Sequence, residues 1–250
     1  MRYRMKDSRR FVPSMLTMLN LFFGFFAIVN ALQDKFVTAS WLIIMAAVWD
    51  ALDGKIARFT HSHSEFGVQF DSITDVVSFG VAPAILIYQV ALYKIGAFGV
   101  IISFLPLLFG AIRLARFNVN LDGFEKENFS GLPIPVQAAA LSTYVIFNYD
   151  LWEGLRFGPV LIPLVLFLCF LMVSSVEYEM MPKFSFRENK RNSFLLALLL
   201  LGVVAVVVFQ ERAMFPAVMG FILFYFFRSF LMHGKEQEDD DEIYDVSLPD

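Results

Sequence analysis

The chain has 250 residues, of which 58% are hydrophobic and 18% are charged, and its mean hydropathy is +0.62. Its 30 phenylalanines exceed the needs of a soluble core, and stretches such as NSFLLALLLLGVVAVVVF have no polar face, so the composition argues against a soluble helical protein and indicates a membrane protein. The net charge of −4 is unevenly spread, because seven of the ten residues in EQEDDDEIYD are acidic. We expect that segment to be a disordered tail and expect no nucleic-acid partner.

About twenty apolar residues span a bilayer as a helix, and on this measure the sequence predicts an all-α bundle of eight spans. In chain order the predicted spans cover residues 13–32, 37–56, 74–93, 97–115, 133–149, 158–176, 193–210 and 214–231. The apolar run of the first span is too long for a signal peptide and no convincing cleavage site follows it, so we expect a retained helix. The expected organisation is an N-terminal segment over 1–12, a transmembrane domain over 13–232 and an acidic disordered tail over 233–250.

The basic residues predict the orientation of these spans. With the N-terminus inside, 16 of the 20 Lys and Arg residues fall on the inner side and four on the outer side. This is a strong positive-inside bias. We therefore expect an integral protein of the cytoplasmic membrane with both termini in the cytoplasm. The same assignment places residues 49–75 at the cytoplasmic side.

Four aspartates lie where the second and third spans meet the cytoplasmic side. An Asp at a helix centre costs about 2.5–3.5 kcal/mol on insertion scales. Asp50 and Asp53 are three residues apart, and Asp71 and Asp75 are four apart, so each pair shares one helix face. Charges reaching out to water would explain one or two aspartates but not four at helical spacing. The pattern predicts an oxygen-only site for Mg²⁺ or Mn²⁺.

Small residues and one cation accompany the carboxylates. Gly54 follows Asp53 directly, Gly67 stands four residues before Asp71, and Ala57 lies near the Gly54 face. Because a helical Gly costs about 1 kcal/mol relative to Ala, we expect something to approach the backbone closely there. Arg58 would lie at the cytoplasmic mouth, where a guanidinium can bind phosphate. Together these residues indicate a pyrophosphate site.

The arrangement Asp50-x-x-Asp53-Gly54-x-x-Ala57-Arg58, eight residues, Gly67-x-x-x-Asp71-x-x-x-Asp75 resembles the signature of the CDP-alcohol phosphotransferases at every fixed position. The resemblance implies a six-helix core over about 13–176, a homodimer, and an enzyme that displaces CMP from a CDP-linked donor with an alcohol. It implies that the four aspartates hold two divalent ions and that Asp75 is the general base. Residues lining the nucleotide and diphosphate pocket would be Gly54, Ala57, Arg58 and Gly67, with Thr17 and Asn20 either at the cytidine or in helix packing.

Two further stretches, AIRLARFNV at 111–119 and FSGLPIP at 129–135, resemble the phosphatidylserine synthases within this family. That likeness implies CDP-diacylglycerol and L-serine as substrates in a membrane-lipid pathway. Arg113 and Arg116 would bind the serine carboxylate or a lipid phosphate, or would be simple positive-inside anchors, and Asn118 would orient the acceptor. Gly131 and the prolines after it would shape the entry to the fifth span.

Two alternatives stay open at this point. Within the family, the acceptor of a phosphatidylglycerophosphate or phosphatidylinositol synthase would suit the same signature. Outside it, intramembrane acids also mark ion and proton transporters. Transporter sites lie near the bilayer midplane, however, whereas these aspartates are expected near the cytoplasmic side.

Overall fold

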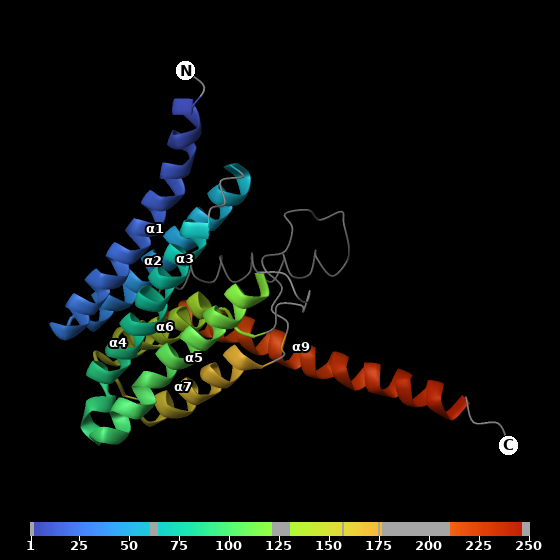
Figure 1. The fold of residues 1–250 in the computed structure, drawn as a ribbon. Coiled ribbons are helices and arrows are strands. Elements are labelled where there is room, and N and C mark those ends of the chain that lie inside the picture. The colour runs from blue at the N-terminus through green and yellow to red at the C-terminus, as the bar shows by residue number, and fades with distance from the viewer. Residues whose placement is uncertain are drawn as a thin grey trace.

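A computed structural model describes residues 3–60, 65–121, 131–156, 158–174, 176 and 211–246 of the chain. Every regular element within these ranges is a helix (Figure 1). Four helical segments are long and apolar enough to cross a membrane, and they cover Met15–Leu32, Phe36–Ile56, Phe66–Val90 and Ala97–Asn118. The protein is thus an all-α membrane protein. The count of eight spans stays a prediction, because the seventh, 193–210, lies outside the described residues.

The first two helices form an antiparallel hairpin. Helix α1 (Tyr3–Leu32) and helix α2 (Phe36–Thr60) are joined by a short turn in which the Lys35 N–H bonds the Asn30 carbonyl at 3.0 Å. Buried alanines on both helices, such as Ala27 and Ala46, let the two backbones approach closely, as is usual between helices in a membrane.

The third span is continuous but changes its winding. Helix α3 (Glu65–Asp75) passes into the π-helical turn η1 (Val76–Val81), and α4 (Ala82–Val90) completes the span. The prediction of 74–93 therefore started too late. Polar residues such as Asp71 precede the apolar run in the sequence, but in the structure they lie inside the helix that continues into it.

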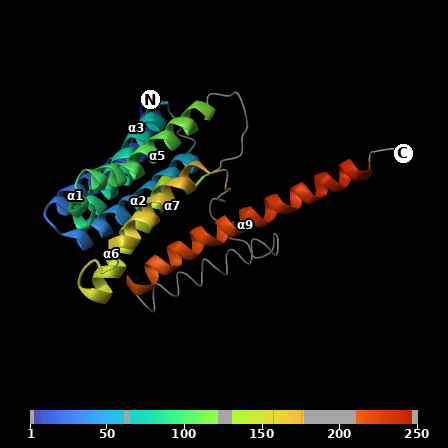
Figure 2. The same ribbon diagram turned by 90° about the horizontal axis from the view of Figure 1, so that it is seen from below.

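The remaining described elements complete the bundle. They are the short turn η2 (Leu92–Ile95) and the helices α5 (Ala97–Leu121), α6 (Ile134–Trp152), α7 (Gly158–Val173) and α9 (Glu211–Val246). Helix α9 runs well past the predicted span 214–231, through most of the segment expected to be a disordered tail (Figures 1 and 2). The division into 1–12, 13–232 and 233–250 stays a prediction.

Helix α6 is deeply packed, and its side chains from Ile134 to Ile146 are largely buried. Contacts between aromatic rings connect it to two other helices. The ring centroid of Tyr144 lies 5.1 Å from that of Phe215 in α9, and the ring centroid of Tyr149 lies 6.0 Å from that of Phe36 in α2. Figure 2 shows α9 running alongside α6 and α7. The α1–α5 group and α9 are thereby held on different sides of α6.

Gly131 shapes the start of α6. Its N–H donates to the Val176 carbonyl at 2.8 Å, and its φ is +97°. A β-carbon at this position would lie 3.0 Å from the carbonyl carbon of Met172. Pro133 then caps the helix, and Pro135 sits in its first turn, where a missing N–H costs nothing. The structural role expected for these residues is confirmed.

Replacing Gly131 by Ala is expected to lower the free energy of unfolding by at least about 1–3 kcal/mol, because the positive φ is strained for any side chain and the methyl group meets the backbone of α7. Thermal unfolding in detergent measures the loss. Gly220→Ala is the matched control, since Gly220 lies in α9 with open space around it. A Gly131→Ala variant with the same melting temperature as the wild type would contradict this account.

Candidate functional site

Three of the four aspartates meet at one point between α2 and α3. Asp50, Asp71 and Asp75 each present a carboxylate oxygen, and these oxygens all lie within 4.8 Å of one another. The spacings explain the meeting, because residues 71 and 75 share one face of α3 while Asp50 projects from the adjacent α2. The sequence analysis placed these three side chains in one site, and the structure brings them together.

Asp53 lies apart from that group of three. It is buried, and its Oδ2 accepts a hydrogen bond of 2.5 Å from the hydroxyl of Thr17 on α1. A separation of three residues turns Asp53 about 60° around the α2 axis from Asp50. That rotation directs the carboxylate toward α1. Any role of Asp53 in metal binding would therefore depend on its position next to the three converging carboxylates, because its own carboxylate is not one of them.

Helix α1 contributes a second polar side chain to the site. Asn20 is fully buried, and its Nδ2 donates to Oδ1 of Asp75 at 3.4 Å. Ser78, in η1, donates in turn to the main-chain oxygen of Asn20 at 3.1 Å. The sequence analysis missed Ser78, which stands three residues after Asp75 and offers no motif. The expected contact of Thr17 and Asn20 with cytidine stays a prediction.

Several buried polar atoms of the site have no hydrogen-bond partner among the described residues, namely Asp71 Oδ1, Asn20 Oδ1 and Arg113 Nε. Unpaired buried polar atoms are rare and need an explanation. Carboxylate oxygens that converge and stay unsatisfied suit a hard divalent cation such as Mg²⁺ or Mn²⁺. The residues present therefore fit a divalent metal site formed by Asp50, Asp71 and Asp75.

The basic residues of α5 separate into two environments. Arg113 is partly buried, with its Nε shielded from solvent, and it lies within electrostatic range of Asp75. Arg116, less than one turn further along, is exposed. Asn118 is bound to α3, because its Nδ2 donates to the Ser72 hydroxyl at 3.0 Å. Of the residues expected to bind the acceptor, Arg113 thus lies near the carboxylates, whereas Arg116 is exposed.

The glycines of the motif lie on the two helices that carry the aspartates. Gly54 is in α2 and Gly67 is in the first turn of α3, and both are partly buried. Ala57 and Arg58 belong to the last turns of α2, but their side chains fall outside the described part of the chain. The pyrophosphate-binding role of these four residues stays a prediction.

A family model described as CDP-alcohol phosphatidyltransferase matches residues 10–181, which include all four aspartates and Arg113. The chain belongs to the CDP-alcohol phosphatidyltransferase family. The resemblance inferred from the motif is confirmed, and a transporter is no longer a reasonable alternative.

Curated relatives within the family carry related names. The chain is 35% identical over 215 residues to a CDP-diacylglycerol--serine O-phosphatidyltransferase of Helicobacter pylori, covering 85% of this chain and 88% of the relative. It is 38% identical over 170 residues to the archaetidylserine synthase of Methanothermobacter thermautotrophicus, covering 67% and 69% of the two chains. A CDP-diacylglycerol--serine O-phosphatidyltransferase of Bacillus subtilis is 31% identical over 67% of this chain and 89% of its own.

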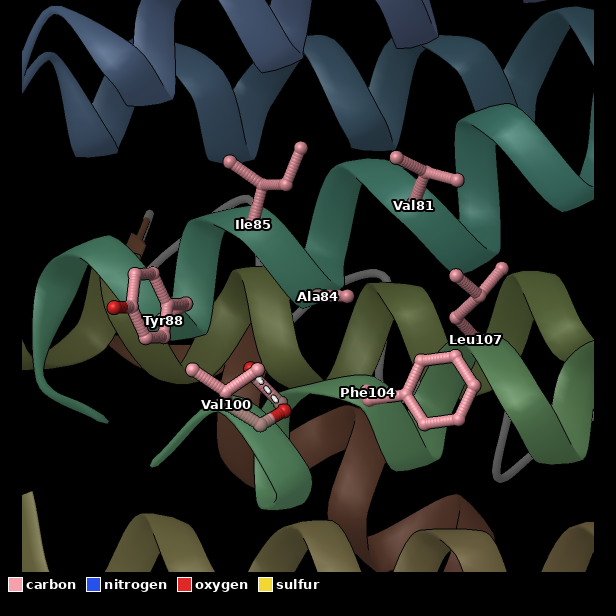
Figure 3. Close-up of a pocket in the computed structure, with 8 residues that line it drawn as sticks. Val81, Ala84, Ile85, Tyr88, Val100, Phe104 and Leu107 are labelled. Atoms are coloured by element: carbon pink, nitrogen blue, oxygen red, sulfur yellow. Dashed lines mark hydrogen bonds between the residues drawn. The ribbon is translucent and has the colours of Figure 1, made fainter. Parts of the chain in front are cut away.

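A separate pocket lies further along the third span from the aspartates. It has a volume of about 360 Å³ and is lined by residues of η1, α4 and α5, among them Ile85, Tyr88 and Phe104. Figure 3 shows these side chains between α4 and α5. Val81, the lining residue of this span nearest to Asp75 in the chain, is about 9 Å beyond it along the helix axis. The lining has almost no polar surface, so the pocket does not supply the groups that the reaction needs.

The aspartate group predicts measurable metal binding. We expect the wild-type protein in detergent to bind Mn²⁺, and we expect Asp50→Asn and Asp71→Asn to weaken that binding at least tenfold, roughly the loss seen even when residues that only orient a ligand are changed. Isothermal titration calorimetry or Mn²⁺ paramagnetic resonance measures it. Asp150→Asn is the matched control, because Asp150 pairs with Arg212 at the far end of α6. Equal affinity in all four proteins would rule the site out.

Proposed function

We propose that the protein transfers the phosphatidyl group of CDP-diacylglycerol to the hydroxyl of L-serine and releases CMP. The observation that carries the proposal is the position of Arg113, a partly buried cation within electrostatic range of Asp75 in the aspartate site. A guanidinium there matches an acceptor that bears a carboxylate. The names of the relatives, which specify serine or archaetidylserine, support the same acceptor.

The proposed reaction is a displacement at phosphorus. The serine oxygen forms a bond to the phosphorus that carries the diacylglycerol, and the bond from that phosphorus to the CMP oxygen breaks. The serine proton passes to the carboxylate of Asp75. Asp75 suits this role because it is buried beside Arg113 and Asn20 holds one of its oxygens, so its orientation is fixed before the acceptor arrives.

Two divalent ions, Mg²⁺ or Mn²⁺, held by Asp50, Asp71 and Asp75 with Asp53 alongside, would supply charge neutralisation for the diphosphate and for departing CMP. Gly54, Ala57, Arg58 and Gly67 would line the diphosphate pocket, because small residues permit close approach and Arg58 complements phosphate. Thr17 and Asn20 would border the nucleotide from α1. Asn118, fixed by Ser72, would border the acceptor.

The setting that we propose is the cytoplasmic membrane, with both termini and the active site on the cytoplasmic side. The bias of 16 inner against four outer basic residues supports that orientation. A homodimer is proposed by resemblance to the family. The acceptors of phosphatidylglycerophosphate and phosphatidylinositol synthases remain the alternatives within the family.

The acceptor is tested by CMP release from CDP-diacylglycerol by the purified protein in Mn²⁺. We expect release with L-serine, and little with serinol, ethanolamine, glycerol 3-phosphate or inositol, because serinol and ethanolamine lack the carboxylate and the other two present a different shape and charge to Arg113. Excess EDTA should abolish the serine-dependent rate. Release with glycerol 3-phosphate or inositol and none with serine would show that the acceptor is misassigned.

Arg113 and Arg116 form a matched pair for the same prediction. Arg113→Ala is expected to raise the KM for serine by roughly 10-fold or more, the loss expected for a hydrogen bond to a charged group, with a smaller effect on the KM for CDP-diacylglycerol. Arg116→Ala should leave the KM for serine nearly unchanged, because Arg116 is exposed. Equal effects of the two variants on the KM for serine would show that Arg113 does not bind the acceptor.

The variants Asp75→Asn and Asp53→Asn are expected to lose activity for different reasons. Asp75→Asn keeps size and shape but removes the base, so turnover should fall by about 10²–10⁴-fold while CDP-diacylglycerol still binds. Asp53→Asn should instead weaken binding of the nucleotide. Binding titrations in Mn²⁺ beside steady-state rates distinguish the two outcomes. Near-normal turnover by Asp75→Asn would show that another group takes the proton.

A further inference from the structure

Helix α1 and the π-helical turn η1 meet with almost no space between them. Both Gly24 and Ser78 are buried at this crossing. A β-carbon added to Gly24 would lie 2.7 Å from the Cα and 2.8 Å from the Cβ of Ser78. Real β-carbons do not approach other atoms so closely, and one of the contacted atoms is backbone. Any side chain at position 24 would therefore move α1 away from η1.

The same crossing carries a hydrogen bond that leads to the active site. The Ser78 hydroxyl donates to the main-chain oxygen of Asn20 at 3.1 Å. The side chain of that same Asn20 donates to Asp75, and Thr17 donates to Asp53. Positions 17, 20 and 24 follow the i, i+3, i+7 spacing of a single helix face. One face of α1 thus carries the contact with η1 and both contacts with the carboxylates.

The π-helical winding places Ser78 at this crossing. Asp75 is the last residue of α3, and the Ala82 N–H then bonds the Val77 carbonyl, five residues back rather than four. The extra residue rotates the later part of the span relative to Asp75 by about 100° compared with an unbroken α-helix. Such π-turns often occur at functional sites. Here the turn begins immediately after the residue assigned as the base.

We propose that Gly24 and Ser78 are positioning residues for the transfer reaction. By fixing the separation and rotation of α1 against η1, they hold the Asn20 amide against one oxygen of Asp75, so that the other oxygen keeps its orientation toward the reacting hydroxyl. Asn20 Oδ1 remains buried and without a partner among the described residues, which leaves it free to meet a bound substrate. The inference rests on the proposed function only in taking Asp75 as the base.

A role in packing alone makes a different prediction. If the crossing only stabilises the bundle, changes at Gly24 and Ser78 lower the melting temperature and leave turnover of the folded protein intact. If it positions Asn20, turnover falls in protein that is still folded and still binds CDP-diacylglycerol. The separation of kcat from KM and from melting temperature distinguishes the two roles.

The experiment compares two variants with two matched controls in the CMP-release assay, using the full chain in detergent with Mn²⁺. Gly24→Ala is expected to lower kcat roughly 10²-fold, since a displacement of about 1 Å can have that effect. Ser78→Ala, which removes only the hydroxyl, should lower kcat less but measurably, with little change in the KM for CDP-diacylglycerol. The controls Gly220→Ala and Ser40→Ala should retain wild-type turnover, because Gly220 has open space and the hydroxyl of the buried Ser40 donates within its own helix, to the Phe36 carbonyl.

A double-mutant cycle tests whether the effect passes through Asn20. We expect Asn20→Ala with Ser78→Ala to be no slower than Asn20→Ala alone, because residues that act as one unit are not additive. Multiplicative losses, or wild-type turnover in folded Ser78→Ala, would overturn the proposal. Ser78→Ala decides the matter if Gly24→Ala does not fold.

Rates are expressed relative to the wild type with whichever acceptor the wild type uses. Failure of the wild type with serine therefore overturns the proposed acceptor and leaves the positioning test intact.

Discussion

The mutual repulsion of carboxylates inside a membrane protein is the constraint around which the described helices are arranged. Asp50, Asp71 and Asp75 meet within 4.8 Å, and like charges at that separation in a weakly polar interior are costly. Two surrounding helices supply a donor and a cation to this group: Asn20 of α1 donates to Asp75, and Arg113 of α5 lies within electrostatic range of it. Thr17 of α1 donates to the neighbouring Asp53. One carboxylate oxygen of Asp71 still has no hydrogen-bond partner among the described residues. A divalent cation would supply the positive charge that this oxygen lacks.

The convergence of the aspartates could be predicted because it follows from helical spacing alone. The deviation of Asp53 toward Thr17 could not, since it depends on where α1 packs, and a single helix wheel carries no information about its neighbours. The late start assigned to the third span has a related cause. Hydropathy treats Asp71 as a boundary, whereas in the folded protein α3 runs from Glu65 through Asp71 to Asp75.

Arg113 and Arg116 show a similar limit. Three residues apart near one end of the same helix, they are equivalent by spacing and by charge. Only the packing of α5 in the bundle leaves Arg113 partly buried and Arg116 exposed. No sequence feature indicated that Ser78 contacts another helix, because an isolated serine in an apolar run usually bonds within its own helix. Its importance depends on a π-helical turn that a search for periods of 3.6 residues does not detect.

That turn gives the third span two independent halves. Over η1 the helix carries one residue more than α-helical winding would use, as the bond from Ala82 to Val77 shows, so the faces before and after it are set separately. Loss of one residue from Val76–Val81 would rotate α4 about its axis by about 100° without disturbing Asp71 or Asp75. A single insertion or deletion in η1 would therefore change which side chains α4 presents to its neighbours, while the spacing of the aspartates stays unchanged.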